Sequence, residues 1–193
     1  KFITKIKPDE RWISLEFCEK KIERHLSRLS CNRVETFLIH DVKILFNKNG
    51  SKIFKNLEQL KNKYFKKIGI SIYEVDRLDF LTSNYSIDVI QCPFNIIDKR
   101  ILNTGWFNKL KKLNIEIHAR SIFLQGLLVD EFFYKRKYFK KWEYNFLKWF
   151  QWLKSNKISP IDYCLTDLLK SDFDQIIVGI NDCNNLKEII NFK

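Results

Sequence analysis

A chain of 193 residues, of which 45% are hydrophobic, can form one domain with a sizeable core. No apolar run approaches the roughly 18 residues of a membrane span and we read no signal peptide, so we expect a cytoplasmic protein that does not bind membranes. The net charge of +12 comes mostly from lysine, and arginine, the better reader of bases, is scarce. We therefore expect no dedicated nucleic-acid surface.

The five cysteines are scattered and include no CxxC pair. This pattern predicts free thiols rather than a disulfide framework or a zinc site. The histidines His25, His40 and His118 also lack metal-ligand spacing, so we expect no bound metal.

Six short apolar runs predict buried strands. In chain order they are Phe2–Ile6, Val34–Ile39, Ile68–Ile72, Ile87–Ile90, Ile115–Ala119 and Gln175–Ile180. Continuous Val/Ile/Leu runs are typical of parallel strands, because helices cover both faces of such sheets. The expected fold class is therefore α/β, with right-handed crossovers between strands.

The segments between these runs predict helices through their apolar spacing and turn residues. Ser51 is the expected N-cap of the second helix. The expected helices are 9–29, 51–64, 75–81, 99–113, a helix carrying Phe139 to Leu153, then 160–169 and 184–190.

The stretch Phe132–Leu153 contains eleven aromatic residues among its 22. From Phe139 onward, its aromatic residues recur at steps of three and four, which predicts an amphipathic helix. We expect this stripe to pack on the sheet. A helix that stacks nucleobases or lies on a membrane surface is the alternative.

Each expected strand ends in a polar residue that could take part in chemistry. These residues are Lys5, His40, Ser71, Gln91, Arg120 with Ser121, and Asn181. In parallel α/β proteins, functional groups gather at the carboxyl ends of the strands. Six such ends predict a single active-site face.

Several segments together resemble the aldo/keto reductase superfamily. They are Phe2-Ile3-Thr4-Lys5, Thr36-Phe37-Leu38-Ile39-His40, Ile68-Gly69-Ile70-Ser71-Ile72-Tyr73, Asp88-Val89-Ile90-Gln91-Cys92-Pro93-Phe94-Asn95, the stretch from His118 to Leu128, and Ile176-Ile177-Val178-Gly179 with the helix after it. The Ser-Ile-Phe-Leu-Gln-Gly-Leu run from Ser121 is similar to a Ser-Val-Phe-Leu-Gln-Gly-Leu stretch of bacterial members.

The resemblance implies one domain over residues 1–193, folded as an incomplete (β/α)8 barrel. The first strand matches the third of the family, so two βα units of roughly 60 residues would be missing. It also implies hydride transfer from NADPH or NADH to a small-molecule carbonyl. The proton-donating tyrosine of the family and its aspartate partner would lie on the missing part, so we expect the fragment alone to be inactive.

The same resemblance assigns roles to individual residues. Lys5 matches the lysine that favours ionisation of the tyrosine, and His40 matches the histidine that orients the carbonyl. Ser71 and Gln91 match residues that hydrogen-bond the nicotinamide carboxamide.

The rest of the cofactor would lie on the later segments. Arg120 stands where many members stack an aromatic ring on the nicotinamide, and a guanidinium can stack or pair with phosphate. Ser121 and the loop through Gly126 match the pyrophosphate segment. The adenosine-phosphate site would include Gly179, Asn181 and Asn185, near a helix N-terminus. Asn185 stands where an arginine often binds the 2′-phosphate, which leaves both NADPH and NADH open.

Two alternatives remain at this point. A doubly wound, flavodoxin-like sheet would pair its strands out of sequence order. A non-catalytic nucleotide-binding or pathway-regulatory protein would keep the barrel without the reaction. The sequence specifies neither substrate nor oligomeric state.

Overall fold

The computed structural model describes residues 2–132, 135 and 137–192. The chain forms two compact units, one made of Lys1–Cys92 with Ile101–His118, and the other of Pro93–Arg100 with Ala119–Lys193. We call them unit 1 and unit 2.

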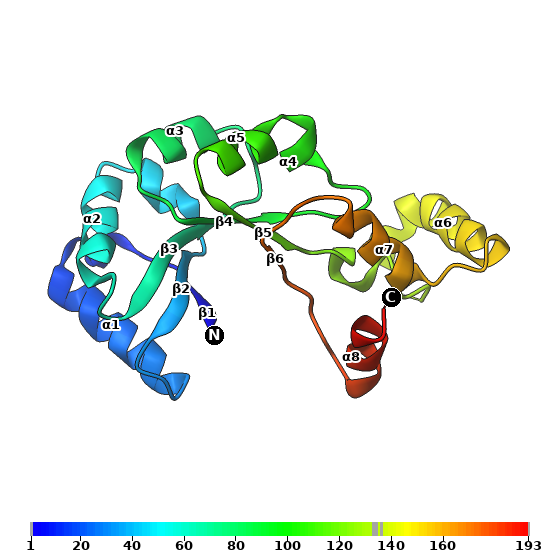
Figure 1. Cartoon of the computed structure of the whole chain (residues 1–193), viewed down its shortest axis with the longest axis horizontal. Coiled ribbons are helices and arrows are strands. Elements are labelled where there is room, and N and C mark those ends of the chain that lie inside the picture. Colours follow the sequence, from blue (N-terminus) through cyan, green and yellow to red (C-terminus); the bar gives the residue numbers. More distant parts are fainter. Residues whose placement is uncertain (1, 133–134, 136, 193) are drawn as a thin grey trace. The chain divides into compact units, whose positions relative to one another are not determined.

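Six strands form one sheet in strict sequence order. They are β1 (Ile3–Ile6), β2 (Val34–Ile39), β3 (Phe65–Ser71), β4 (Val89–Pro93), β5 (Glu116–Arg120) and β6 (Gln175–Ile176) (Figure 1). The strands from β1 to β4 pair in parallel, each with its neighbour along the chain. This order confirms the α/β fold of an incomplete (β/α)8 barrel and excludes the flavodoxin-like alternative.

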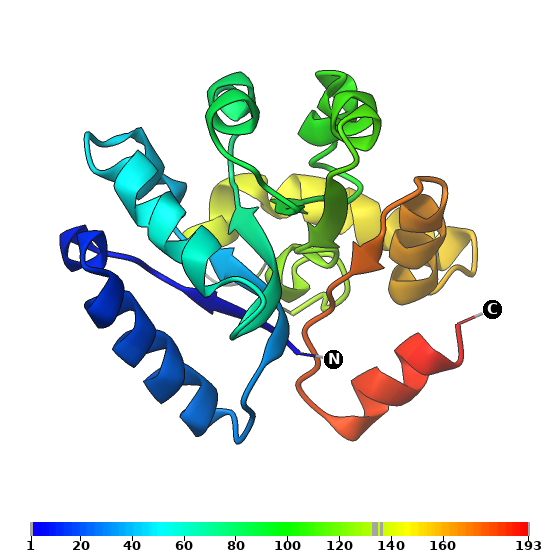
Figure 2. The ribbon, with the colours of Figure 1, turned by 60° about the vertical axis from the view of Figure 1, so that its left-hand side comes forward.

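In unit 1, helices cover the outer face of the first strands (Figure 2). The longest are α1 (Leu15–Arg28) and α2 (Gly50–Leu60), followed by α3 (Leu78–Asn84) and α5 (Trp106–Lys112). The apolar stripe of α1 buries Ile22 and Leu26, and the rings of Phe37 and Phe65 stack between neighbouring strands at 5.0 Å. The predicted apolar runs therefore form the core of this unit.

The first predicted helix, 9–29, is broken at Ser14. A 3-10 turn, η1 (Glu10–Ile13), is capped by Asp9, and α1 then begins after Ser14, whose side chain accepts a hydrogen bond from the amide of Phe17. Two capping residues so close together favour two helical segments over one.

The prediction of Ser51 as an N-cap is wrong by two positions. Helix α2 begins at Gly50, and the capping position is Asn49, whose side chain donates to Glu10 at 2.6 Å instead of capping the helix. The glycine is required here, because a Cβ at this position would lie 2.8 Å from the Cα of Leu45. Close backbone approach therefore fixed this boundary.

The predicted helix 99–113 is also two helices. Gly105 has a φ of 77° and separates α4 (Arg100–Asn103) from α5. This left-handed conformation suits glycine and ends the helical hydrogen bonding.

Unit 2 begins its helical part with the 3-10 turn η5 (Lys137–Trp142), followed by α6 (Glu143–Ser155) and α7 (Pro160–Leu169). The aromatic stripe is only partly buried. Phe146 and Phe150 are covered, whereas Trp142 is 41% exposed. The rings of Trp149 and Trp152 both lie edge-on against Tyr163 of α7, so part of the stripe packs on a helix.

The last predicted strand, Gln175–Ile180, is shorter than expected. The amide of Ile177 donates to Ala119 at 2.8 Å, but regular pairing ends there. Ser121 has a φ of 60° and turns the neighbouring segment away, so the residues after Ile177 lack a strand to pair with. Helix α8 (Cys183–Ile190) follows. None of the helices in the described residues has the length and apolarity needed to cross a bilayer.

Candidate active site

The side chains of Lys5 and Gln91, from the first and fourth strands, contact each other. The ammonium of Lys5 on β1 donates a hydrogen bond of 2.8 Å to the side-chain oxygen of Gln91 on β4. Gln91 is buried, while Lys5 is exposed. Two of the predicted site residues therefore lie on the same face of the sheet and contact each other directly.

Ser71 stands next to Gln91 in the parallel register of β3 and β4. Its side chain is buried, and its hydroxyl oxygen has no hydrogen-bond partner among the described residues. Buried polar atoms in proteins are nearly always paired, so an unpaired hydroxyl at the end of a strand is a candidate ligand contact.

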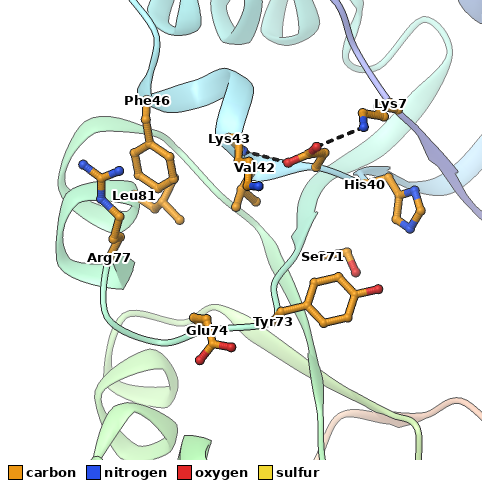
Figure 3. A pocket seen from close by; sticks show the side chains of 11 residues that line it. Lys7, His40, Val42, Lys43, Phe46, Ser71, Tyr73, Glu74, Arg77 and Leu81 are labelled. Atoms are coloured by element: carbon orange, nitrogen blue, oxygen red, sulfur yellow. Dashed lines mark hydrogen bonds and ion pairs between the residues drawn. The ribbon is translucent and has the colours of Figure 1, made fainter. Parts of the chain in front are cut away.

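His40 follows β2 and is exposed; its amide donates to Ile6 at 2.8 Å, which fixes the backbone here. His40 and Ser71 line one cavity of about 470 Å³, at the carboxyl ends of the unit 1 strands (Figure 3). We call it the His40 pocket. Lys5 and Gln91 are not among its lining residues.

Charged groups that the sequence analysis did not single out also line the His40 pocket. Lys7 forms an ion pair of 3.1 Å with Asp41, and Asp41 also accepts the amide of Lys43 at 3.1 Å. Partial burial disfavours the charged carboxylate, but these two partners outweigh it, and the pKa of Asp41 is lowered. The sequence signal was the Asp41-Val42-Lys43 run after His40, which is a helix-capping pattern.

The other wall of the pocket is apolar and carries Arg77. The guanidinium carbon of Arg77 lies 4.0 Å above the centre of the Phe46 ring, and Val42 and Leu81 also line the pocket. Arg77 and Phe46 are 31 positions apart in the sequence, so periodicity alone could not pair them.

In unit 2, two loops are clamped together around Arg120 and Ser121. The amide of Phe94 donates to the Arg120 carbonyl at 2.9 Å, and the Asn95 side chain donates to the Ser121 carbonyl at 3.2 Å. The Arg120 guanidinium also donates to the Ser121 hydroxyl at 3.1 Å. The strand-end residues predicted here are thus held by the segment after β4.

Asn95 is the centre of this clamp. It is 3% exposed, and its side-chain oxygen accepts the amides of Ile97 and Asp98. Asp98 in turn pairs with Arg100 through both carboxylate oxygens, and this pairing lowers the pKa of Asp98. In the sequence, Asn95 stands out only as part of a family segment, and no pattern there indicates its positioning role.

The loop after Ser121 has an unusual backbone. Leu124, Gln125 and Gly126 have φ values of 46°, 59° and 93°, in the left-handed region that glycine tolerates best. A short 3-10 turn, η3 (Leu124–Gly126), results. The amides of Leu124 and Gly126 each donate at 2.9 Å to a carbonyl of the same loop, so they are engaged within the turn.

At α8, the side chain of Asp182 caps the helix and accepts the amides of Asn184 and Asn185 at 2.8 and 2.9 Å. The helix N-terminal amides that were expected to receive an anion are therefore engaged by a carboxylate. Gly179 has open space around its Cα, and Asn181 is exposed.

No group of three histidine, cysteine, aspartate or glutamate side chains in the described part of the chain could hold a metal ion. All five cysteines are free thiols.

Parallel strands in sequence order, joined by helices and with polar groups at their carboxyl ends, define a (β/α)-barrel type of protein. The sequence model of the Aldo/keto reductase family matches residues 2–192. The chain therefore belongs to the aldo/keto reductase family.

Solved structures of the family share this fold. The holo form of aldo-keto reductase AKR11C1 from Bacillus halodurans has a TM-score of 0.77 at 18% identity, covering 97% of this chain and 64% of that one. The thermostable aldo-keto reductase Tm1743, solved with the inhibitor epalrestat, has a TM-score of 0.68 at 19% identity, covering 97% of this chain and 64% of that one. The glycerol dehydrogenase AKR11B4 from Gluconobacter oxydans has a TM-score of 0.59 at 14% identity, covering 97% of this chain and 68% of that one.

The chain thus spans less than two thirds of the length of AKR11C1 and Tm1743. No curated protein matches it.

Proposed function

We propose that the protein to which this chain belongs is an NAD(P)H-dependent oxidoreductase that reduces a small-molecule carbonyl. The observation that carries the proposal is the buried, unpaired hydroxyl of Ser71 beside Gln91, at the carboxyl end of neighbouring parallel strands. A hydroxyl and an amide in adjacent register offer the hydrogen-bond pattern that a carboxamide needs. Family membership over residues 2–192 supports the same function and a single domain.

The cofactor, when bound, supplies the hydride. Ser71 and Gln91 would hold its carboxamide, and the Arg120 guanidinium and the Ser121 hydroxyl would bind its phosphates. Gly126 would let the backbone approach the phosphates closely rather than donate to them, because its own amide donates to the Phe123 carbonyl at 2.9 Å. These groups have the right chemistry for such a ligand. At α8 the fit is weaker, because Asp182 is engaged with the helix amides, so we propose that Gly179, Asn181 and Asn185 contact the adenosine part without a strong anion site.

His40 would donate a hydrogen bond to the substrate carbonyl and orient it for attack. Lys5 would act through its positive charge, lowering the pKa of a proton-donating tyrosine. We propose that this tyrosine lies outside the 193 residues, so that the chain alone binds cofactor but does not reduce carbonyls. We also propose a cytoplasmic location.

A non-catalytic, nucleotide-binding role on the same barrel is the second candidate. The contact between Lys5 and Gln91 favours it, because the lysine ammonium is directed to an amide. The two candidates differ in turnover but share a cofactor site.

The test is a fluorescence titration of NADPH and NADH into the chain, with Ser71→Ala and Gln91→Leu as site variants. We expect each variant to weaken binding about tenfold, as for the loss of one buried hydrogen bond of about 1.4 kcal/mol. Unchanged affinity in both variants would contradict the cofactor site. Carbonyl reduction by a chain extended upstream with its native coding sequence would distinguish the enzyme from the non-catalytic candidate.

A further inference from the structure

Two cations of the His40 pocket have no acidic partner at ion-pair distance among the described residues. They are Lys43, whose side chain is exposed, and Arg77, which lies over the ring of Phe46. The third cation, Lys7, forms an ion pair of 3.1 Å with Asp41, and the Asp41 carboxylate also attracts Lys43 at longer range. The pocket therefore has positive charge available for a ligand, offset only in part by Glu74 on its rim.

Arg77 is held in a conformation that suits anion recognition. Its guanidinium rests against the face of Phe46 at 4.0 Å, and the Phe46 ring in turn contacts Phe80 at 5.4 Å between ring centres. A guanidinium that stacks on a ring keeps its N–H edge free, and that edge matches carboxylate and phosphate oxygens in pairs. Less side-chain entropy is lost on binding, because the stack already orders the group.

The remaining lining of the pocket suits the apolar part of a small organic ligand. Val42, Phe46 and Leu81 supply an apolar wall, and the volume of about 470 Å³ falls in the range of small-molecule sites. Figure 3 places Arg77 and His40 at opposite sides of the cavity. A ligand could therefore place one polar group at each side and its apolar part between them.

We propose that the His40 pocket selects carbonyl compounds that carry a carboxylate or phosphate, with the anion at Arg77 and Lys43 and the carbonyl at His40. This rests on the proposed reductase function, which it narrows to anionic substrates. The charge of the ligand is recognised away from the reacting group, so the pocket discriminates between substrates before any chemistry occurs.

The test is calorimetric titration of the 193-residue chain with three aldehydes: 4-carboxybenzaldehyde, 4-formylphenyl phosphate and the neutral 4-(hydroxymethyl)benzaldehyde. We expect at least one anionic aldehyde to bind about tenfold more tightly than the neutral one, as for a charge-assisted contact with two exposed cations. The two anionic probes distinguish carboxylate from phosphate. Added salt should weaken only the anionic ligands.

Arg77→Gln should remove most of this preference, and Lys43→Gln should reduce it. The matched control is Arg28→Gln, which removes the same charge from an exposed position on α1 outside the pocket. Circular dichroism of each variant checks folding, and Lys43→Gln carries the test if Arg77→Gln does not fold. Equal binding of neutral and anionic aldehydes, or an equal effect of Arg28→Gln, would overturn the inference.

Failure of the anion-site inference can be distinguished from failure of the reductase proposal. Benzoate and phenyl phosphate, which lack a carbonyl, should also bind in an Arg77-dependent manner. If they do and NADPH does not bind, the anion site stands and the reductase function fails. If NADPH binds at Ser71 and Gln91 but the anions show no preference, only the present inference fails.

Discussion

The ammonium of Lys5 and the side-chain oxygen of Gln91 lie 2.8 Å apart, although two strands separate β1 from β4 in the sheet. This single contact ties the first strand of the chain to the fourth. It also joins the residue proposed to act on a proton donor to a residue proposed to bind the cofactor.

A double-mutant cycle measures this contact. Lys5→Met and Gln91→Leu should show a coupling of about 1 kcal/mol in the free energy of unfolding, because the hydrogen bond is charge-assisted but Lys5 is exposed. The measurement is urea unfolding of the two single variants and the double variant. Lys66→Met, which removes a surface lysine paired with Glu35, serves as the control and should be additive with Gln91→Leu. Additivity of Lys5→Met with Gln91→Leu would contradict the contact.

Asn95 should control the loop that carries Arg120 and Ser121. Asn95→Ala removes three hydrogen bonds from a buried side chain, and we expect a loss of about 3 kcal/mol in unfolding free energy. NADPH affinity should fall as well. The control is Asn156→Ala, which removes one exposed side-chain bond to Trp152 in the same unit. If Asn95→Ala weakened NADPH binding no more than Asn156→Ala does, Asn95 would have only a structural role.

The pairing of Asp98 with Arg100 predicts a dependence of stability on pH. The pKa of Asp98 is lowered by Arg100 in the folded protein, so its contribution is present above the ordinary value of 3.8 and is lost as pH falls through the lowered value. The difference in melting temperature between the wild type and Asp98→Asn should therefore shrink below pH 3.8. Asp76→Asn, at an exposed loop position, should show a smaller difference throughout. A difference that stays constant down to acid pH would argue against the ion pair.

Replacement by alanine should have different effects on stability at two glycine positions. Gly50→Ala would place a Cβ 2.7 Å from the carbonyl carbon of Leu45, where only backbone could yield, and should cost about 1–3 kcal/mol. Gly179→Ala meets no atom within 4 Å and should change stability by less than about 0.5 kcal/mol. Thermal unfolding measures both. Any loss of NADPH affinity in Gly179→Ala could then be assigned to ligand contact, whereas a large loss of stability would show that the position is packed.

Thiol labelling reports the burial of the cysteines. Burial raises the pKa of Cys18 to about 11 and that of Cys164 to about 12, and Cys92 is 1% exposed. With a disulfide reagent near pH 8, Cys183 should react first, Cys31 more slowly, and the other three only after unfolding. Cys183→Ser should remove the fast phase. Rapid labelling of Cys18 in the folded protein would contradict its burial on the inner face of α1.

The apolar runs in the sequence were sufficient to locate the strands, because buried parallel strands are rich in Val, Ile and Phe. Their order followed from the resemblance to a barrel family rather than from the runs themselves. Helix α7 also matches its prediction at both ends, where Ser159 caps the first turn. The errors lie where distant segments decide local structure. Gly50 starts α2 because the Leu45 backbone approaches it, and the strand at Gln175 ends early because Ser121 turns away.

The site was predictable to the extent that polar residues follow the strands. Lys5 with Gln91, and His40 with Ser71, are brought together as the carboxyl-end pattern predicts. The stacking of Arg77 on Phe46 and the clamp at Asn95 were not predictable, since each depends on loops whose contacts have no periodic signal.

Helix α8 has no buried residue, and Leu186 and Ile190 are 39% and 69% exposed. An eight-residue helix is too short to persist in water through its own hydrogen bonds, and the Asp182 cap contributes only about 1 kcal/mol. Amide hydrogens of α8 should therefore exchange with solvent far faster than those of β2 or β3. A ligand that contacts Asn185 would have to order this turn as it binds, and part of its interaction energy would be spent on a coil-to-helix transition.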